Sequence, residues 1–288
     1  MFPASFGYLA PQSLQEALAL LDEHGDEAKL LAGGHSLIPA MKLRLASPRY
    51  LIDIGQLANL RGIKIEAGNL AIGALTVHAD IASSALVREH FPGLAEAAAV
   101  IGDPQVRNRG TIGGSVAHAD PAADFPVILT ALNGSFVLQS PSGSRTVAAD
   151  DFFLDFFTTV MKGNEILTEV RIPLQPGAVG SAYVKLGHPA SGYVVVSAGA
   201  LVSHRSGSCV FARIAAGGLG SGPTRAAAAE KELQGKMLTT DGIAAAVAKV
   251  SEGIAVEGDD YASADYKRHL ASVYARRAIE AAVARAKD

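Results

Sequence analysis

Apolar residues recur at helical spacing near the start of the chain. Ser13 and Glu16 have the spacing of a capping box, and leucines and alanines then repeat on one helical face until Gly25. Because glycine favours helix ends, this pattern predicts a helix over about 14–24. Further helical segments are predicted over 78–87 and 93–101.

Short apolar runs bounded by glycine or proline predict the strands of the first half of the chain. The runs "KLLA" and "YLIDIG" suit buried strands on either side of a glycine-rich loop. Alternation of apolar and polar residues predicts hairpins around 67–69 and 141–144. The run "ILTEVRIP" predicts a strand that ends at Pro173.

A segment rich in proline and glycine, 174–180, marks a boundary. Beyond it, "SAYVKLG", "GYVVVSAGALVS" and "CVFARIAAGG" predict three strands of one meander, followed by helices from about 224, 241 and 264. In the last helix, Leu270 and Ile279 are expected to face inward and Arg285 outward. We therefore expect an α+β fold with one domain over 1–176 and a second over 177–288, the second with a three-stranded antiparallel sheet and helices.

Charge and hydropathy exclude several classes of partner. The formal net charge of −3 and the pI near 6.2 give no basic surface, so we expect no nucleic-acid partner and no binding to a membrane surface. No stretch approaches the roughly 20 apolar residues that span a bilayer. The first residues, "MFPASFGYLAP", lack the pattern of a signal peptide, so a cytoplasmic location is the default expectation.

The chain has a single cysteine, Cys209. One thiol cannot hold an iron–sulfur cluster, so any redox metal is expected on another chain, and Cys209 is interpreted as a small buried residue of a strand. His118, Asp120 and Asp124 have a spacing that invites a metal ion, but Pro121 makes the segment a turn and no cysteine or repeated histidine accompanies them. We therefore expect no metal bound by this chain.

Two loops share one pattern, in which a glycine pair follows an apolar residue and precedes a serine. They are "LLAGGHSLIPAMKLRL" over 30–45 and "RGTIGGSVAHADPAADFP" over 109–126. Paired glycines let backbone N–H groups converge on an anion. We predict that Gly34 and Gly114 lie close together in space and that the two loops hold one diphosphate. Neither loop contains GxxxxGK[ST] or GxGxxG, so neither of those nucleotide fingerprints is present.

Other interpretations of these features remain open. Glycine accounts for 30 of the 288 residues, so each pair could instead be an ordinary turn. The still richer "AAGGLGSGPT" over 215–224 is interpreted as a strand-to-helix turn, because Pro223 stands where a dinucleotide fingerprint needs its third glycine. Asp124 precedes "FPVILTAL" and could be a helix cap that also faces a ligand. The absence of GxSxG argues against a serine hydrolase.

The two loops together resemble the FAD-binding signatures of the medium subunit of molybdenum hydroxylases, the carbon monoxide dehydrogenase and xanthine dehydrogenase family. The resembling segments are "AGGHSLIPAMKLR" and "TIGGSVAHADPAAD". The resemblance extends over essentially the whole chain. Further segments that carry it are "IGDPQVRNRG", "NEILTEVRIP", "AYVKLGHPASGY" and "ADYKRHLASVYARRAIEAA". The resemblance implies a two-lobed FAD-binding domain of the p-cresol-methylhydroxylase type, with lobes over about 1–55 and 56–176, closed by the C-terminal domain.

The resemblance also implies which residues contact FAD. By position they are Ala32, Gly33, Gly34, His35, Ser36, Leu37, Ile101, Thr111, Ile112, Gly113, Gly114, Ser115, Asp124, Leu167, Lys185 and Tyr193. Asp124 would meet the sugar or ribityl hydroxyls and Leu167 the adenine end, while Lys185 would approach the flavin ring and Tyr193 lie against it. Ser115 stands where the family often has asparagine or aspartate, which keeps a hydroxyl but shortens its reach. "KLGHPASGY" lacks the "KLKRK" character of the carbon monoxide enzymes and "HADPAAD" differs from their "HGDPGND", which puts carbon monoxide as the substrate in doubt.

The function implied is electron transfer within a complex. Electrons would come from a large subunit with a molybdopterin-type cofactor, through a small [2Fe–2S] subunit, to FAD on this chain, and leave to NAD, a quinone or oxygen. The complex would be a heterotrimer, doubled into a dimer of heterotrimers. Two alternatives are a self-sufficient flavin oxidase of the same fold class and a non-catalytic assembly subunit that binds no flavin.

Overall fold

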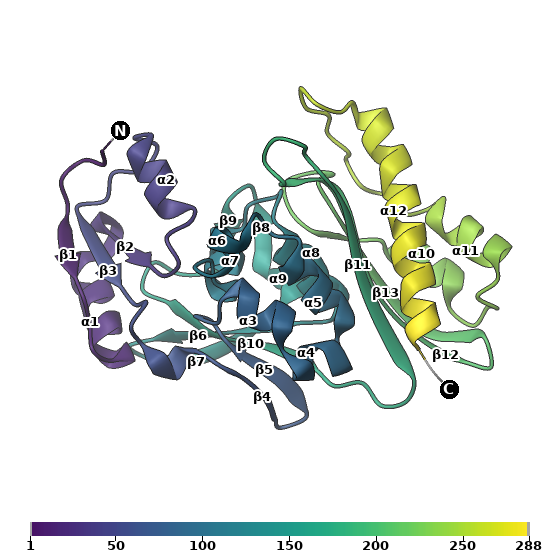
Figure 1. The fold of residues 1–288 in the computed structure, drawn as a ribbon, viewed down its shortest axis with the longest axis horizontal. Coiled ribbons are helices and arrows are strands. Elements are labelled where there is room, and N and C mark those ends of the chain that lie inside the picture. Colours follow the sequence, from purple (N-terminus) through teal and green to yellow (C-terminus); the bar gives the residue numbers. More distant parts are fainter. Residues whose placement is uncertain (1, 287–288) are drawn as a thin grey trace.

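The computed structural model describes residues 2–286 of the chain. Three larger sheets follow one another along the long axis of the molecule, from the N-terminal part to the long C-terminal helix (Figure 1). No helix within the described residues is long and apolar enough to cross a membrane. The α+β fold expected from the sequence is confirmed.

The first sheet is small and parallel, with strand order β1-β3-β2. Its elements are β1 (Gly7–Leu9), α1 (Leu14–His24), β2 (Ala28–Leu31), α2 (Leu37–Lys42) and β3 (Tyr50–Asp53), with short 3₁₀ turns at Gly25–Glu27 and Ala58–Leu60. The predicted helix over 14–24 is confirmed, and the Ser13 hydroxyl caps it by accepting from the Glu16 N–H. Its leucines form a core with the first sheet.

The second sheet is antiparallel, with strand order β4-β5-β10-β6-β7. Its strands are β4 (Ile63–Glu66), β5 (Asn69–Gly73), β6 (Ser135–Ser140), β7 (Gly143–Ala148) and β10 (Ile166–Pro173). Both predicted hairpins are present as the pairs β4·β5 and β6·β7. A separate short hairpin, which the sequence did not predict, joins β8 (Phe153–Asp155) and β9 (Thr158–Thr159).

Seven short helices accompany this sheet. They are α3 (His78–Ser83), α4 (Ala85–His90), α5 (Pro92–Ala99), α6 (Pro104–Arg107), α7 (Ile112–His118), α8 (Asp124–Ala131) and α9 (Ala149–Phe152). The single helix expected over 78–87 is wrong, because Ser84 has an extended backbone and its hydroxyl accepts from the Val87 N–H to begin a second helix. The largest core cluster lies between these helices and the sheet, around Phe125, Phe136 and Phe152.

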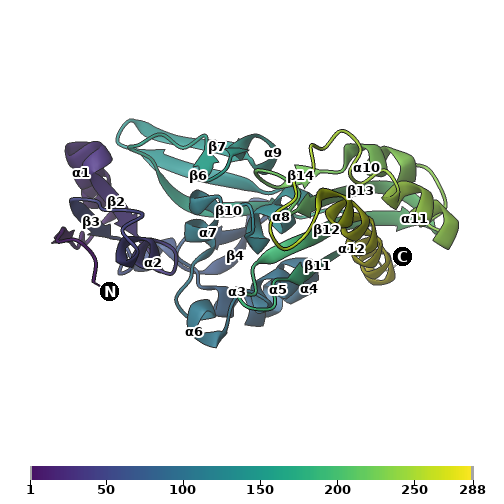
Figure 2. The ribbon, with the colours of Figure 1, turned by 90° about the horizontal axis from the view of Figure 1, so that it is seen from above.

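The third sheet is antiparallel and has four strands, not the three expected. They are β11 (Val179–Gly187), β12 (Val194–Arg205), β13 (Ser208–Gly217) and β14 (Thr224–Arg225), followed by α10 (Ala227–Leu233), α11 (Thr240–Val247) and α12 (Ala264–Arg285). Thr224 was expected to begin a helix but pairs with Ala216 in β14. A two-residue strand has no periodicity that a sequence pattern could reveal. Helix α12 covers one face of this sheet. Helices α5 and α8, which accompany the second sheet, also contact the third sheet (Figures 1 and 2).

Close backbone contact joins α5 to β11. A β-carbon at Gly93 would lie 2.8 Å from the backbone of Ala182, and the Gly93 N–H donates to the Ser181 hydroxyl at 3.1 Å. Arg285 was expected to face outward, but its guanidinium binds the Glu96 carboxylate of α5 and donates to the Ser181 carbonyl at 2.7 Å. Only a tertiary partner explains this position, because nothing in the helical periodicity distinguishes it.

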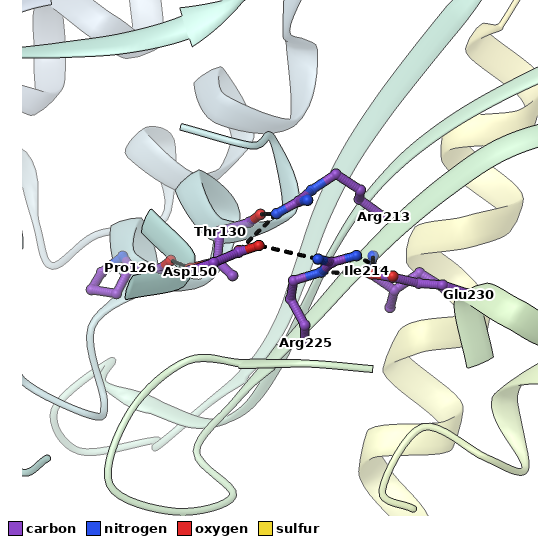
Figure 3. A network of polar contacts seen from close by, with 7 residues as sticks. All are labelled: Pro126, Thr130, Asp150, Arg213, Ile214, Arg225 and Glu230. Carbon is purple, nitrogen blue, oxygen red and sulfur yellow. Dashed lines mark hydrogen bonds and ion pairs between the residues drawn. The ribbon is translucent and has the colours of Figure 1, made fainter. Parts of the chain in front are cut away.

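A polar network forms a second contact between these parts (Figure 3). Asp150 accepts from Arg213 at 2.7 Å and from Arg225 at 3.1 Å, and Arg213 also donates to the Thr130 carbonyl at 2.9 Å. Arg225 further pairs with Glu230, whose carboxylate accepts from the Ile214 N–H at 2.8 Å. The third sheet is therefore tied to α8 and α9 through its own arginines.

Candidate functional site

The two glycine loops touch each other. A β-carbon at Gly33 would lie 2.2 Å from the Arg109 carbonyl oxygen and 2.9 Å from the α-carbon of Gly110. Only glycine permits this approach. The contact brings together segments from the first sheet and from the helices over the second sheet. It is made by Gly33 and the Arg109–Gly110 backbone, whereas the close approach expected for Gly34 and Gly114 stays a prediction.

A small cavity of about 100 Å³ opens beside this contact. Its walls include Ala32 and Gly55 on one side and Thr111 on the other, with Arg61 and Arg109 among its charged groups. Arg61 is fixed by donating to the Gly55 carbonyl at 2.8 Å. A larger cavity, of about 260 Å³, lies elsewhere, against the 220–224 turn. The smaller one is the candidate cofactor cleft, because it alone of these two is lined by both loops.

The first loop offers unpaired backbone donors. Within residues 2–286, no hydrogen-bond acceptor is found for the N–H groups of Gly34, His35 and Ser36. Gly34 has φ +77°, a conformation that favours glycine, and its carbonyl accepts from the Ile38 N–H as α2 begins. This loop therefore presents the N–H groups that an anionic cofactor needs.

The second loop uses its donors internally, contrary to the expectation that both loops present free amides. The Gly113 N–H donates to the Ala74 carbonyl at 2.9 Å, and the Gly114 N–H donates to the Thr111 hydroxyl at 3.1 Å. Gly113 is buried, and a β-carbon there would lie 2.5 Å from that of Ala74. Gly113 therefore packs α7 against the end of β5, whereas Gly114 is exposed and Ser115 is half-buried.

Asp124 is not the helix cap that its position before "FPVILTAL" suggested. It is the first residue of α8, and its buried carboxylate accepts from the Tyr183 hydroxyl at 2.8 Å and lies 2.9 Å from the Lys185 ammonium. Burial raises the pKa of Asp124, although Lys185 and Tyr183 oppose the rise. Burial beside Asp124 also raises the pKa of Tyr183 well above its ordinary value.

Lys185 connects this buried group to the loop that carries Tyr193. Its ammonium also donates to the Gly192 carbonyl at 2.8 Å, and the Val194 N–H donates to the Ala122 carbonyl at 3.1 Å. Tyr193 is 48% exposed. A strand of the C-terminal sheet thereby places Tyr193 beside the second loop, where it can contact a ligand.

Two further residues expected at the cofactor lie outside the contact between the loops. Leu167 is buried in the core of the second sheet, and Ile101 is half-buried after α5, where its carbonyl accepts from Arg107 at 3.0 Å. Sequence reasoning missed Arg61, Arg109 and His78, which lie in or beside the cleft. An isolated arginine or histidine leaves no pattern, so nothing in the sequence could have selected them.

The residues suspected of binding a metal are dispersed. The His118 ring packs on Phe157 with centroids 5.1 Å apart, and among residues 2–286 no group of three or more His, Cys, Asp or Glu side chains could hold a metal ion. Cys209 is buried in β13, as expected, and burial raises the pKa of its thiol to about 11.

Two family models cover most of the chain. Residues 4–175 match the FAD binding domain in molybdopterin dehydrogenase, and residues 181–282 match the CO dehydrogenase flavoprotein C-terminal domain. The chain belongs to the family of FAD-binding medium subunits of molybdenum hydroxylases. The resemblance recognised in its two loops is therefore confirmed, and FAD is the cofactor of this domain.

Relatives in this family match almost end to end. The carbon monoxide dehydrogenase medium chain of Hydrogenophaga pseudoflava is 44% identical over 99% of each chain, and the glyceraldehyde dehydrogenase medium chain of Sulfolobus acidocaldarius is 40% identical over 97% of this chain and 99% of its own. A solved structure of carbon monoxide dehydrogenase from Hydrogenophaga pseudoflava covers 100% of each chain with a TM-score of 0.95 and 44% identity. Quinoline 2-oxidoreductase from Pseudomonas putida 86 covers 100% of each chain, with a TM-score of 0.93 at 32% identity.

The residues of the cleft fit FAD. The first loop supplies unpaired N–H groups for a diphosphate, and the Gly33–Gly110 approach leaves no room for a β-carbon. The lining carries two arginines, Arg61 and Arg109, against one carboxylate, Asp53. The second loop supplies a fixed wall rather than donors.

Proposed function

We propose that this chain relays electrons in a three-subunit molybdenum hydroxylase, in the cytoplasm, binding FAD between its two glycine loops. FAD, when bound, supplies one-electron and two-electron redox chemistry. A small [2Fe–2S] subunit would deliver the electrons, and a large subunit with the molybdenum cofactor would oxidise the substrate. This division of labour is supported by the single buried cysteine of this chain and by relatives that carry the name of medium chain.

One observation carries the proposal: the contact between Gly33 and the Arg109–Gly110 backbone, with free N–H groups beside it. In this proposal the first loop binds the diphosphate, Asp124 and Lys185 meet the hydroxyls and the flavin ring, and Tyr193 lies against the ring. The other proposed FAD contacts are Ala32, Leu37, Ile101, Thr111, Ile112, Ser115 and Leu167. The work of these residues is to bind and orient the cofactor and to exclude water around it.

We further propose that the domains divide at 176/177, with lobes over about 1–55 and 56–176, and that two heterotrimers associate. The organic substrate would be set by the large subunit. That view is supported by relatives of similar identity that act in different complexes, one named for carbon monoxide and one for glyceraldehyde. NAD, a quinone or oxygen would accept the electrons.

The proposal is tested by purifying the full-length chain through an affinity tag from its own host, with whatever subunits accompany it. The flavin released by denaturation should be FAD, at one per chain, and a large subunit with molybdenum and a small subunit with iron and sulfur should copurify. A preparation with FAD but no partners that oxidises an organic substrate would support the self-sufficient oxidase instead. A folded preparation without flavin would overturn the proposal.

A further inference from the structure

His78 is a buried histidine directly beneath the second loop. It begins α3 and is 5% exposed, and its backbone N–H donates to the Gly110 carbonyl at 3.0 Å. A β-carbon at Gly110 would lie 2.5 Å from His78 Nε2 and 2.9 Å from Cδ2, so this edge of the ring lies against the glycine that touches Gly33. His78 therefore contacts Gly110, one of the residues through which the two loops meet.

One nitrogen of this ring has no partner. His78 Nδ1 is buried and makes no hydrogen bond within the described residues, while the ring packs edge-on against Phe125 with centroids 5.1 Å apart. Burial of a polar atom without a hydrogen bond is unfavourable. A buried, unpaired imidazole beside a binding cleft is an unusual arrangement that packing alone does not explain.

The surroundings of His78 hold it in the neutral form. Burial is the largest cause that lowers the pKa of His78, and together with the electrostatic effects of His35 in the first loop and Arg107 in α6 it brings that pKa to about 4. The acids of the neighbouring helices α8 and α5 are engaged elsewhere. Asp124, beside the Phe125 ring, pairs with Lys185, and Glu96 of α5 pairs with Arg285.

The remaining charged residues nearby do not offset this effect. On α3 itself and on α4 the charged side chains Asp80, Arg88 and Glu89 are exposed to solvent, and His90, the last residue of α4, is half-buried. The two groups with a resolved electrostatic effect on the His78 ring, His35 and Arg107, both disfavour its protonation.

We propose that His78 binds a proton when the FAD diphosphate enters between the two loops, so that cofactor binding is coupled to proton uptake by a residue that does not touch the cofactor. The proposal rests on the proposed position of FAD. The charge of His35 in the first loop affects the pKa of His78, and Gly110 of the second loop contacts the His78 ring. In this proposal a diphosphate between the two loops therefore lies close enough to affect the same pKa. His78 is thus a positioning residue that responds to the charge of the ligand.

The sign of the effect follows from linkage. A diphosphate dianion close to a partly buried histidine raises the pKa of that histidine by roughly one to two units. The protonated form of His78 then favours FAD, so affinity rises as pH falls from neutral toward 5. For a shift of about 1.5 units, FAD should bind about fourfold more tightly near pH 5 than near pH 7.5.

The test uses flavin-depleted full-length protein, in the assembly in which it purifies. FAD affinity is measured by flavin fluorescence between about pH 5 and 7.5, and proton uptake by calorimetry in two buffers of different ionisation enthalpy. Wild-type protein should take up about two-thirds of a proton per FAD near pH 5 through His78. His78→Gln, which keeps a neutral polar side chain, should lose that uptake and the matching pH dependence while still binding FAD at neutral pH.

Two controls separate the possible results. His269→Gln changes an exposed histidine of α12 and should leave the uptake unchanged. Any uptake that remains in His78→Gln should disappear in the His35→Gln, His78→Gln double variant. If His78→Gln fails to fold, the proton uptake of His78→Asn is measured instead and compared with that of the wild-type protein.

Absence of uptake in wild-type protein near pH 5, or equal uptake in wild-type protein and His78→Gln, overturns the inference. Either result leaves the proposed function standing, provided that FAD binds. Failure of Gly33→Ala to weaken FAD binding contradicts instead the proposed position of the cofactor, and both proposals with it.

Discussion

Arg285, in the last turn of α12, is joined through its guanidinium to the carboxylate of Glu96, 189 residues earlier in the chain. The same carboxylate accepts from the Tyr183 N–H at 3.0 Å, and Arg285 also donates to the Ser181 carbonyl. The pair thus fixes β11, the strand that carries Tyr183 and Lys185, against α5. Each of its side chains is about one-third exposed, so solvent screens part of the attraction.

We expect Arg285→Ala to weaken the docking of the C-terminal domain by about 1–2 kcal/mol, because the Ser181 carbonyl loses the Arg285 donor and Glu96 keeps only the Tyr183 N–H. Urea unfolding of the full chain measures the loss. Arg277→Ala, an exposed position on the same helix, is the matched control and should change stability by about 0.5 kcal/mol or less. Equal effects of the two variants would contradict the structural role of Arg285.

Gly33→Ala should reduce FAD affinity by about tenfold or more, because the new methyl group would overlap the Arg109 carbonyl and force the two loops apart. Fluorescence titration with FAD gives the affinity, and circular dichroism verifies that the fold persists. Gly163→Ala is the control, since a β-carbon there would meet nothing closer than 3.8 Å. Unchanged affinity in Gly33→Ala would show that the loop contact is dispensable.

Lys185→Met should destabilise the chain by about 3–5 kcal/mol, because it removes the cation that compensates the buried carboxylate of Asp124. The double variant Asp124→Asn, Lys185→Met should recover much of this loss, since no charge then remains buried without a partner. A double-mutant cycle by urea unfolding at neutral pH gives the coupling. Additive losses would indicate that the two groups stabilise the fold independently.

Glu165 should contribute acid-sensitive stability. Its buried carboxylate accepts two hydrogen bonds from Arg145, at 2.7 and 2.9 Å, which hold the pKa of Glu165 below its ordinary value of 4.5. A carboxyl group with a lowered folded pKa stabilises the fold above its unfolded pKa, and this stability is lost as pH falls through the folded pKa. Arg145 is partly exposed, so the contribution is about 1 kcal/mol.

Glu165→Gln should therefore reduce stability near pH 7, and its difference from wild-type protein should shrink as pH drops below about 4.5. Unfolding curves at several pH values measure this. Glu66→Gln, which breaks an exposed pair with Lys64, serves as the comparison and should have little effect. A Glu165→Gln deficit that is constant with pH would exclude the ion pair as its cause.

The sequence predicted the longer elements because their apolar periodicity is strong. Helix α1 and the strands β11, β12 and β13 are examples, each with a continuous buried face. Elements of two or three residues escaped prediction: β8, β9 and β14 are too short to show any period. The break at Ser84 was missed because its capping hydroxyl looks like an ordinary exposed serine in a helix.

The meeting of the two loops could be inferred from their paired glycines, whereas the division of work between them could not. The N–H of Gly113 binds the carbonyl of Ala74, at the end of a strand that no local pattern connects to it. Asp124 was interpreted through its neighbours in sequence, but its partners Tyr183 and Lys185 lie about 60 residues away. Such pairings are decided by tertiary structure, which local propensity does not encode.

The contact between Gly33 and Gly110 has a consequence for the synthesis of the chain. The two walls of the cleft are far apart in sequence, and the groups proposed at the flavin ring come later still, from β11 and the loop after it. A nascent chain on the ribosome therefore has no complete binding surface until the strand with Lys185 has emerged. We expect flavin loading to follow translation of that strand, so that newly made subunits pass through a colourless, cofactor-free stage.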